Sequence, residues 1–181
     1  MEKTLKEFDA VIAGCRELFV KKMKDYGLAW RILRAPSITD QIYIKAQRIR
    51  SIEEKGCHKV ADGIPAEYTG IINYAVMAQI QLAIPFVSVE QDSLDDVQVL
   101  RLYDQYVENA RNLLKDKNHD YGEAWRKMRL SSFTDIILMK LMRIKQIEDN
   151  QGNTEVSEGL DANYYDIFNY AVFAMIQINN Q

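Results

Sequence analysis

The sequence has few of the residues on which most metal and redox sites depend. Its 181 residues include two histidines and two cysteines, Cys15 and Cys57, so a zinc site built from histidine and cysteine is excluded. Two cysteines also make no disulfide framework. The chain has no glycine-rich phosphate loop and no nucleophile elbow, which excludes two common types of catalytic turn.

Long apolar runs are missing as well. Residues 71–87 come nearest to a membrane span, but Asn73, Gln79, Gln81 and Pro85 interrupt them. Residues 1–14 carry acids throughout and have no apolar segment of the signal-peptide type. The net charge of −3 leaves no basic surplus for displacing counterions from double-stranded nucleic acid. We therefore expect a cytoplasmic protein that contacts neither a membrane nor a duplex.

What the chain does contain is an internal duplication. Residues 23–30 read MKDYGLAW and residues 118–125 read NHDYGEAW, and a shift of 95 positions aligns residues 5–55 with residues 100–150. After one inserted residue the match resumes and ends at two Asn-Tyr-Ala-Val segments. We predict a first helical repeat at residues 1–84 (repeat one), a linker at 85–93 and a second helical repeat at 94–181 (repeat two).

Apolar residues recur at intervals of three and four, which indicates helices, and little of the chain alternates with period two. The prediction is an all-α fold of two pseudo-symmetric three-helix repeats packed into one bundle-like domain. Gly27 and Gly122 are expected as left-handed helix caps. Helix starts are predicted from capping boxes. The expected helices are 3–24, 37–54 and 66–84 with their counterparts 96–119, 132–149 and 162–180, and the boxes are Ser37–Asp40, Ser132–Asp135 and Ser93–Asp96.

A lysine interrupts the apolar stripe of the second helix in both repeats, at Lys45 and at Lys140. A buried ammonium needs an anionic neighbour, and an arginine follows three residues later, at Arg48 and at Arg143. Two interpretations remain open: a lysine whose stem packs while its tip reaches water, or an anion pocket. Arginines in the preceding loop, among them Arg126, favour a small phosphorylated ligand, because guanidinium binds phosphate bidentately.

The duplicated aromatic residues allow two interpretations. Tyr121 and Trp125 are either core residues or a stacking surface for a base. Asp120 lies at a helix C-terminus, where the dipole disfavours an acid, so it should have an arginine or a metal as partner. Asp166 and Asn169 share a helix face, whereas repeat one has Gly70 at the position of Asp166. Together with Glu158, these acids are candidate ligands for Mg2+, which takes few carboxylates plus substrate phosphates.

The succession K-x-x-DYG-x-AW, S-x-TD, K-x-x-RI-x-x-I-E and a closing NYA helix resembles the first of the nucleotide-modification-associated domains, in which tandem copies occur. The resemblance covers nearly the whole chain and implies that the protein handles or modifies nucleotides. Repeat two is the more typical copy. A looser likeness is to the all-α nucleoside triphosphate pyrophosphohydrolases, although their paired acidic helix motifs are not cleanly present.

Two hypotheses follow from the sequence. The first is a protein that binds a nucleoside phosphate, with magnesium-dependent cleavage or modification of the nucleotide as the reaction. Its phosphate- and nucleotide-binding candidates are Lys140, Arg143, Arg126, Tyr121, Trp125, Asn169, Lys45 and Arg48, and its metal candidates are Asp120, Glu158 and Asp166. The second is a non-catalytic helical protein-interaction module. The apolar third helix would also permit a homodimer.

Overall fold

The helical periodicity of the sequence corresponds to six α-helices in the computed structural model, which describes residues 2–57, 59, 61–156 and 158–181. No strand occurs within these ranges, so the all-α prediction is confirmed. A short 3-10 helix follows the first helix of each repeat. The elements are α1 (Glu2–Tyr26), η1 (Ala29–Ile32), α2 (Ala35–Lys55), α3 (Ile64–Ala83), α4 (Asp96–Tyr121), η2 (Ala124–Lys127), α5 (Leu130–Asp149) and α6 (Leu160–Asn179).

The two glycine caps are present, but the predicted capping boxes are not. Gly27 and Gly122 both have a φ of 60°, and their amides bond to the preceding helical turn. The helix α2 begins at Ala35, because Pro36 fits the first turn, and its N-cap Arg34 makes no side-chain cap. Ser37 and Asp40 therefore lie inside the helix. The prediction for α5 is wrong in the same way, since that helix begins at Leu130.

The capping box of α4 exists, but two residues later than predicted. The carboxylate of Asp95 accepts a hydrogen bond of 2.7 Å from the amide of Gln98. The Gln98 side chain in turn accepts one of 2.9 Å from the amide of Asp95. The predicted box from Ser93 to Asp96 used the wrong pair within an acidic stretch that offers several possible caps.

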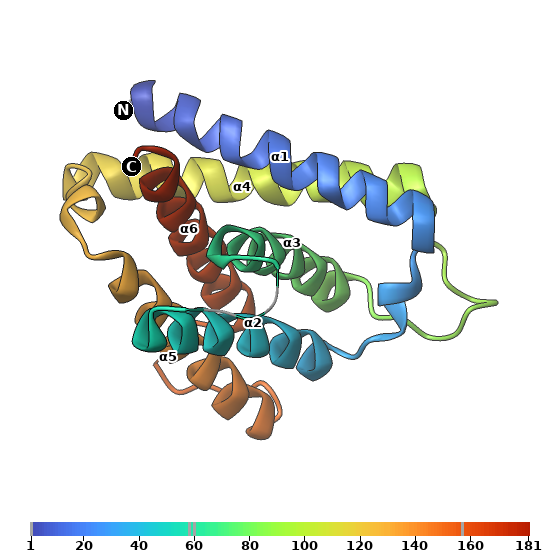
Figure 1. The fold of residues 1–181 in the computed structure, drawn as a ribbon. Coiled ribbons are helices and arrows are strands. Elements are labelled where there is room, and N and C mark those ends of the chain that lie inside the picture. The colour runs from blue at the N-terminus through green and yellow to red at the C-terminus, as the bar shows by residue number, and fades with distance from the viewer. Residues whose placement is uncertain (1, 58, 60, 157) are drawn as a thin grey trace.

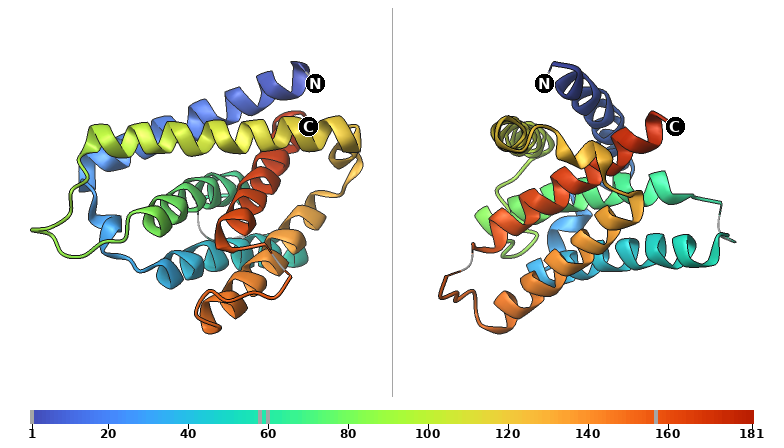
Figure 2. Two further views of the ribbon diagram at one scale, coloured as in Figure 1. Left: turned by 180° about the vertical axis from the view of Figure 1, so that it is seen from behind. Right: turned by 90° about the vertical axis from the view of Figure 1, so that its left-hand side faces the viewer.

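The six helices form three antiparallel pairs, each of which joins equivalent helices of the two repeats. Figure 1 shows α1 beside α4 on one side of the molecule, α3 and α6 in the middle, and α2 and α5 on the other side. Figure 2 shows the same order from behind. The N- and C-termini lie near each other.

Ion pairs across these seams repeat with the roles of the repeats exchanged, which reveals a pseudo-twofold relation. Arg16 pairs with Asp104 at 2.7 Å, and the equivalent Arg111 pairs with Asp9 at 2.8 Å. At the other seam, Lys145 pairs with Asp40 at 2.6 Å while Arg50 lies 3.9 Å from Asp135. The repeats thus pack on each other as pseudo-symmetric units, as predicted.

Two buried hydrogen-bonded clusters tie α2, α3, α5 and α6 together at this pseudo-twofold. In one, the Thr39 hydroxyl donates to Glu148 at 2.8 Å and lies 2.6 Å from the Tyr164 hydroxyl. In its mate, Thr134 donates to Glu53 at 3.0 Å and lies 2.8 Å from the hydroxyl of Tyr68. Burial raises the pKa of both carboxyl groups, with the threonine hydrogen bonds acting against it.

The central pair α3 and α6 contributes more residues to the core than either outer pair. Both helices are apolar on nearly all sides, and their buried residues face each other and the outer pairs. The apolar third helix of each repeat is therefore covered largely within the chain. None of the helices in the described part of the chain combines the length and the apolar character that crossing a bilayer requires.

Candidate functional site

The lysine in the apolar stripe of α5 has an anionic partner from its own repeat. The ammonium of Lys140 donates to Asp166 on α6 at 2.5 Å, and Lys117 on α4 donates to the other carboxylate oxygen at 2.6 Å. The carboxylate is 11% exposed and Lys140 is 12% exposed. Burial raises the pKa of Asp166, but the hydrogen bonds from the two lysines outweigh it and hold the pKa below its ordinary value. Lys117, Asp166 and Lys140 are called the lysine–aspartate bridge below.

Repeat one neutralises its cations with a different acid. Gly70 occupies the position of Asp166, and the stem of Lys45 lies over it, since a Cβ built there would be 2.6 Å from Cε of Lys45. The ammonium of Lys45 instead pairs with Glu67 at 3.3 Å. Glu67 also accepts a short hydrogen bond from Arg48, whose guanidinium further donates to the carbonyl of Asp62 at 2.6 Å. Both cations of repeat one are therefore satisfied internally.

Arg143, the counterpart of Arg48, lacks such an acid. Asn163 stands at the position of Glu67, and its amide donates to the carbonyl of Gly159 at 2.8 Å. Arg143 is exposed and makes no hydrogen bond or ion pair within the described residues. It lines a cleft of 810 Å³ between α5, the segment after it and α6. This anion cleft is also lined by Lys140, Gln146, Asn153, Glu155 and Glu158.

The duplicated DYG-x-AW segment lines an equivalent pocket in each repeat. In repeat one a pocket of 570 Å³ runs from Tyr26 and Trp30 past Gly70 to Lys45. In repeat two the corresponding aromatic pocket measures 330 Å³ and is lined by Lys117, Asn118, Tyr121, Trp125, Asn169 and Tyr170, with Asp166 at its edge. Lys117 and Asp166 line this pocket while Lys140 lines the anion cleft, so the lysine–aspartate bridge stands between the two cavities.

The ring of Trp125 is not free to stack on a base. Phe173 stacks on it with ring centroids 4.2 Å apart and planes 8° from parallel. The guanidinium of Arg126 lies over the same ring at 4.4 Å. Because two groups at these distances cannot share one face, both faces are covered. Tyr121 is 73% exposed at the mouth of the aromatic pocket, so it is the aromatic ring that remains available.

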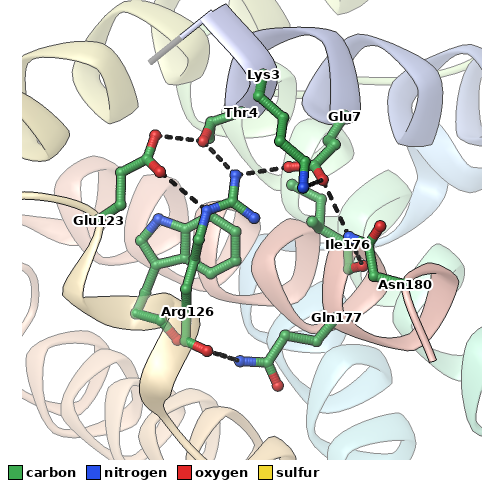
Figure 3. Close-up of polar contacts among 9 residues, drawn as sticks. Lys3, Thr4, Glu7, Glu123, Arg126, Ile176, Gln177 and Asn180 are labelled. Carbon is green, nitrogen blue, oxygen red and sulfur yellow. Dashed lines mark hydrogen bonds and ion pairs between the residues drawn. The ribbon is translucent and has the colours of Figure 1, made fainter.

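Arg126 binds acids of the protein itself. Figure 3 shows its guanidinium between Glu123 and the first turns of α1, where it donates to Glu7 at 2.6 Å and to Thr4 at 2.5 Å. Its Nε donates to Glu123 at 2.9 Å. The hydrogen bond from Thr4, followed by those from Arg126, lowers the pKa of Glu123 to about 2 against the effect of burial. The partners of Arg126 thus hold η2 against the N-terminal helix.

The equivalent Arg31 of repeat one is also structural. It is 1% exposed and donates to both carboxylate oxygens of Asp92, at 2.9 and 3.0 Å. A glutamine of the third helix supports each 3-10 helix. Gln81 donates to the carbonyls of Arg31 and Leu33, and Gln177 donates to those of Trp125 and Met128.

The structure does not assemble the three metal candidates into one cluster. Asp166 is held by two lysines, while Asp120 lies on the exposed end of α4 beside His119, with 3.1 Å between their side chains. Glu158 lines the anion cleft instead. No group of three or more His, Cys, Asp or Glu side chains suited to a metal ion occurs within the described ranges. Magnesium binding stays a prediction.

Asn169 takes part in the packing of repeat two as well as in its pocket. Its amide donates to the carbonyl of Ala110 at 3.1 Å, as Asn73 does to the carbonyl of Cys15 in repeat one. The structure thus brings Lys117, Tyr121, Asp166 and Asn169 to one pocket, and Lys140 and Arg143 to the adjoining cleft.

The sequence predictions missed two residues, each of which differs in type from its counterpart in the other repeat. Glu67 on α3 pairs with two cations, but the aligned position of repeat two is Asn163. Asn118 lines the aromatic pocket where repeat one has Met23. A search for identities between the copies passes over both positions, whereas a search for changes of charge or polarity would have found them.

The fold and the site define an all-helical protein of two pseudo-symmetric repeats, each with a pocket between its duplicated aromatic segment and its third helix. The family model of nucleotide modification associated domain 1 matches residues 22–82 and 117–178, which fall in the two repeats. The chain belongs to this family. No curated protein and no solved structure gives a significant match.

Proposed function

We propose that repeat two binds a nucleoside phosphate, with its phosphate groups in the anion cleft on Arg143 and Lys140. The observation that carries the proposal is Arg143, a cation without a described partner beside the half-buried Lys140. Its counterpart Arg48 is neutralised by Glu67. An arginine in a concave site with no acid of its own is well suited to phosphate, to which guanidinium donates two parallel hydrogen bonds.

Three further features support this proposal. The family to which the chain belongs is described as associated with nucleotide modification. The anion cleft offers amide side chains from Gln146 and Asn153 beside its cations, which suits a polyanion that needs several hydrogen bonds. Glu155 and Glu158 line the same cleft, so a nucleotide that carries magnesium would find one or two carboxylates there.

A thermal-shift series with the whole chain tests the proposal. Nucleoside mono-, di- and triphosphates and inorganic pyrophosphate are each added with and without magnesium, and a ligand of the folded state raises the melting temperature with dose. We expect one class to do so, and Arg143→Ala to weaken its apparent affinity at least tenfold. Arg48→Ala is the matched control: it should lower the melting temperature of the free protein and leave the affinity unchanged.

The outcomes are distinct. Equal loss of affinity in both arginine variants would point to general electrostatic attraction and would contradict a site in repeat two. No shift with any phosphate at millimolar concentration would contradict the proposal as a whole. A shift that needs magnesium and disappears in Glu155→Gln or Glu158→Gln would assign the ion to the cleft.

A second candidate function is the non-catalytic interaction module, which one observation favours. Ile44 on α2 and Met139 on α5 occupy equivalent positions and are 59% and 44% exposed, and Met142 nearby is 51% exposed. Exposed apolar side chains on neighbouring helices are typical of contact surfaces. If this surface joins two copies of the chain, sedimentation should show a dimer that Met139→Lys dissociates; a monomer at all concentrations would contradict it.

A further inference from the structure

The aromatic pocket of repeat two contains buried polar atoms that the protein leaves without partners. Four buried side-chain nitrogen or oxygen atoms of the described residues have no hydrogen bond: Nε1 of Trp30, Nδ2 of Asn118, Nε1 of Trp125 and Oδ1 of Asn169. The last three residues line one pocket, and each is at most 6% exposed. Folded proteins rarely leave such atoms unpaired, because each loses its hydrogen bonds to water without replacement.

Trp30 and Trp125 share their unpaired Nε1, but the unpaired atoms of Asn118 and Asn169 come from differences between the two repeats. In repeat one, Asn73 accepts a hydrogen bond of 2.8 Å from the hydroxyl of Tyr103 on α4. The residue of α1 equivalent to Tyr103 is Phe8, which has no hydroxyl, so Oδ1 of Asn169 loses the matching donor. In repeat one the position of Asn118 is occupied by Met23, whose side chain has no nitrogen or oxygen atom to bury. These two differences thus leave two unpaired buried polar atoms in the pocket of repeat two that have no counterpart in repeat one.

Alternatives that avoid these unpaired atoms are compatible with the fold, since repeat one uses them: Met23 at the position of Asn118, and Tyr103 at the position of Phe8. Retaining an unpaired donor at Asn118 and an unpaired acceptor at Asn169 is unfavourable unless a ligand completes their hydrogen bonds. The three atoms comprise two N–H donors and one carbonyl acceptor, surrounded by the rings of Tyr170 and Phe173. The pocket volume of 330 Å³ is at the lower end of the range of small-molecule sites.

The geometry points to this pocket as the site of a nucleobase, recognised on its hydrogen-bonding edge by Asn118, Trp125 and Asn169. The proposal rests on the proposed function, because it gives the base of the same nucleotide a place across the lysine–aspartate bridge from the phosphates. A base that presents two acceptors and one N–H complements the three atoms. Trp125 contributes its edge, since its faces are covered by Phe173 and Arg126.

The pocket must open slightly for this contact, since the three atoms are covered from solvent in the free protein. Tyr121 lines the same pocket and is largely exposed, so its side chain can turn without breaking the core. After the turn, the phenol ring can cover the face of the bound base.

Unphosphorylated nucleosides test this inference separately from the phosphate site. Adenosine, guanosine, cytidine, uridine and thymidine are titrated into the whole chain by calorimetry, with inorganic pyrophosphate as the phosphate-only probe. We expect at least one nucleoside to bind, and an analogue of it methylated at the ring or amino N–H to bind at least tenfold more weakly. Pyrophosphate binding without nucleoside binding would overturn the base pocket and leave the phosphate site intact. Nucleoside binding without pyrophosphate binding would support the base pocket and contradict the phosphate site.

Two variants test the unpaired atoms directly, one by removing the unpaired donor of Asn118 and one by giving the acceptor of Asn169 a partner, and neither enlarges the pocket. Asn118→Met introduces the residue of repeat one, and Phe8→Tyr offers Asn169 the hydroxyl that Tyr103 offers Asn73. Both should leave the melting temperature of the free protein unchanged or higher, and both should reduce nucleoside affinity at least tenfold. The matched change in repeat one, Tyr103→Phe, should leave that affinity unaltered. If both variants fold and bind nucleosides as the unmodified chain does, or if no nucleoside binds at all, the inference is wrong.

Discussion

The two repeats place the acid of the third helix one turn apart, and this displacement changes the charges that remain available. In repeat one, Glu67 lies close enough to pair with Lys45 and Arg48 together. In repeat two, Asp166 pairs with Lys140 and Lys117, which leaves Arg143 without an acid. The backbone and most of the cations are the same in the two copies. Moving one carboxylate by a helical turn therefore converts a closed ion-pair network into one with a free guanidinium.

The largest expected effect is on the lysine–aspartate bridge. Asp166→Ala leaves Lys140, which is 12% exposed, without its anion, and removal of one partner from a largely buried pair costs roughly 3 kcal/mol of unfolding free energy. Glu67→Ala should cost less, about 1–2 kcal/mol, because Lys45 and Arg48 are 26% and 25% exposed and can reach water. Urea unfolding measures both; a larger loss for Glu67→Ala would contradict the comparison.

A double variant sharpens the same comparison. Asp166→Gly combined with Asn163→Glu transfers the arrangement of repeat one to repeat two. The stability should return to within about 1 kcal/mol of the unmodified chain, since Lys140 can lie over the glycine as Lys45 does over Gly70. Phosphate binding should be lost, because the new carboxylate would neutralise Arg143. Retained binding in a stable double variant would refute the role of the free arginine.

The next effect concerns the glutamines that support the 3-10 helices. Gln81 donates to two backbone carbonyls and also accepts from Arg31 at 2.7 Å, whereas Gln177 only donates to the backbone. Loss of such buried hydrogen bonds costs about 1–3 kcal/mol. We expect Gln81→Met near the upper end of this range and Gln177→Met near the lower. Thermal unfolding of the two variants gives the order, and a reversed order would contradict it.

The acid dependence of stability should differ between the central clusters and the corner around Glu123. The pKa of Glu123 is lowered to about 2, so its contribution is present above the unfolded value of about 4.3 and is lost as the pH falls toward 2. Burial raises the pKa of Glu53 and Glu148, so folding is favoured by their protonation and stability falls as the pH rises past about 4.3.

Unfolding curves from pH 2 to 8 separate these contributions. Glu123→Gln should reduce the loss of stability below pH 4. The double variant Glu53→Gln, Glu148→Gln should reduce the decline of stability as the pH rises past about 4.3. Thr39 and Thr134 donate to these carboxyls, and a glutamine carbonyl preserves that hydrogen bond. If Glu123→Gln leaves the stability below pH 4 unchanged, the ion pairs of Arg126 do not cause the loss of stability in acid.

The smallest effect concerns the Tyr103–Asn73 hydrogen bond. Tyr103→Phe removes the hydroxyl that Phe8 lacks by nature, and should cost about 1 kcal/mol. The two variants Tyr103→Phe and Phe8→Tyr thus make the repeats alike in opposite directions, and their effects on stability should have opposite signs. Measurement of both by urea unfolding tests this; equal destabilisation would show that the two sites are not equivalent.

The sequence by itself determined the duplication, the helix count and the place of a lysine within an otherwise apolar stripe at Lys45 and Lys140. These follow from local causes: apolar spacing fixes which face of a helix packs, and a glycine that reaches positive φ ends the first helix of each repeat. Helix starts were predicted less well, because several side chains near each start can cap it and Pro36 allows an earlier one.

Only the tertiary structure decided which side chains neutralise which charges. The sequence predicts Asp166 as a metal candidate, and only the structure shows that α4 and α5 place a lysine on each of its oxygens. Trp125 and Arg126 are candidates for the nucleotide site in the sequence, and the structure adds that Phe173 of α6 stacks on Trp125 and that Glu7 of α1 pairs with Arg126. These partners lie far along the chain, and Coulomb and packing energies depend on distances through space that helical periodicity alone does not fix.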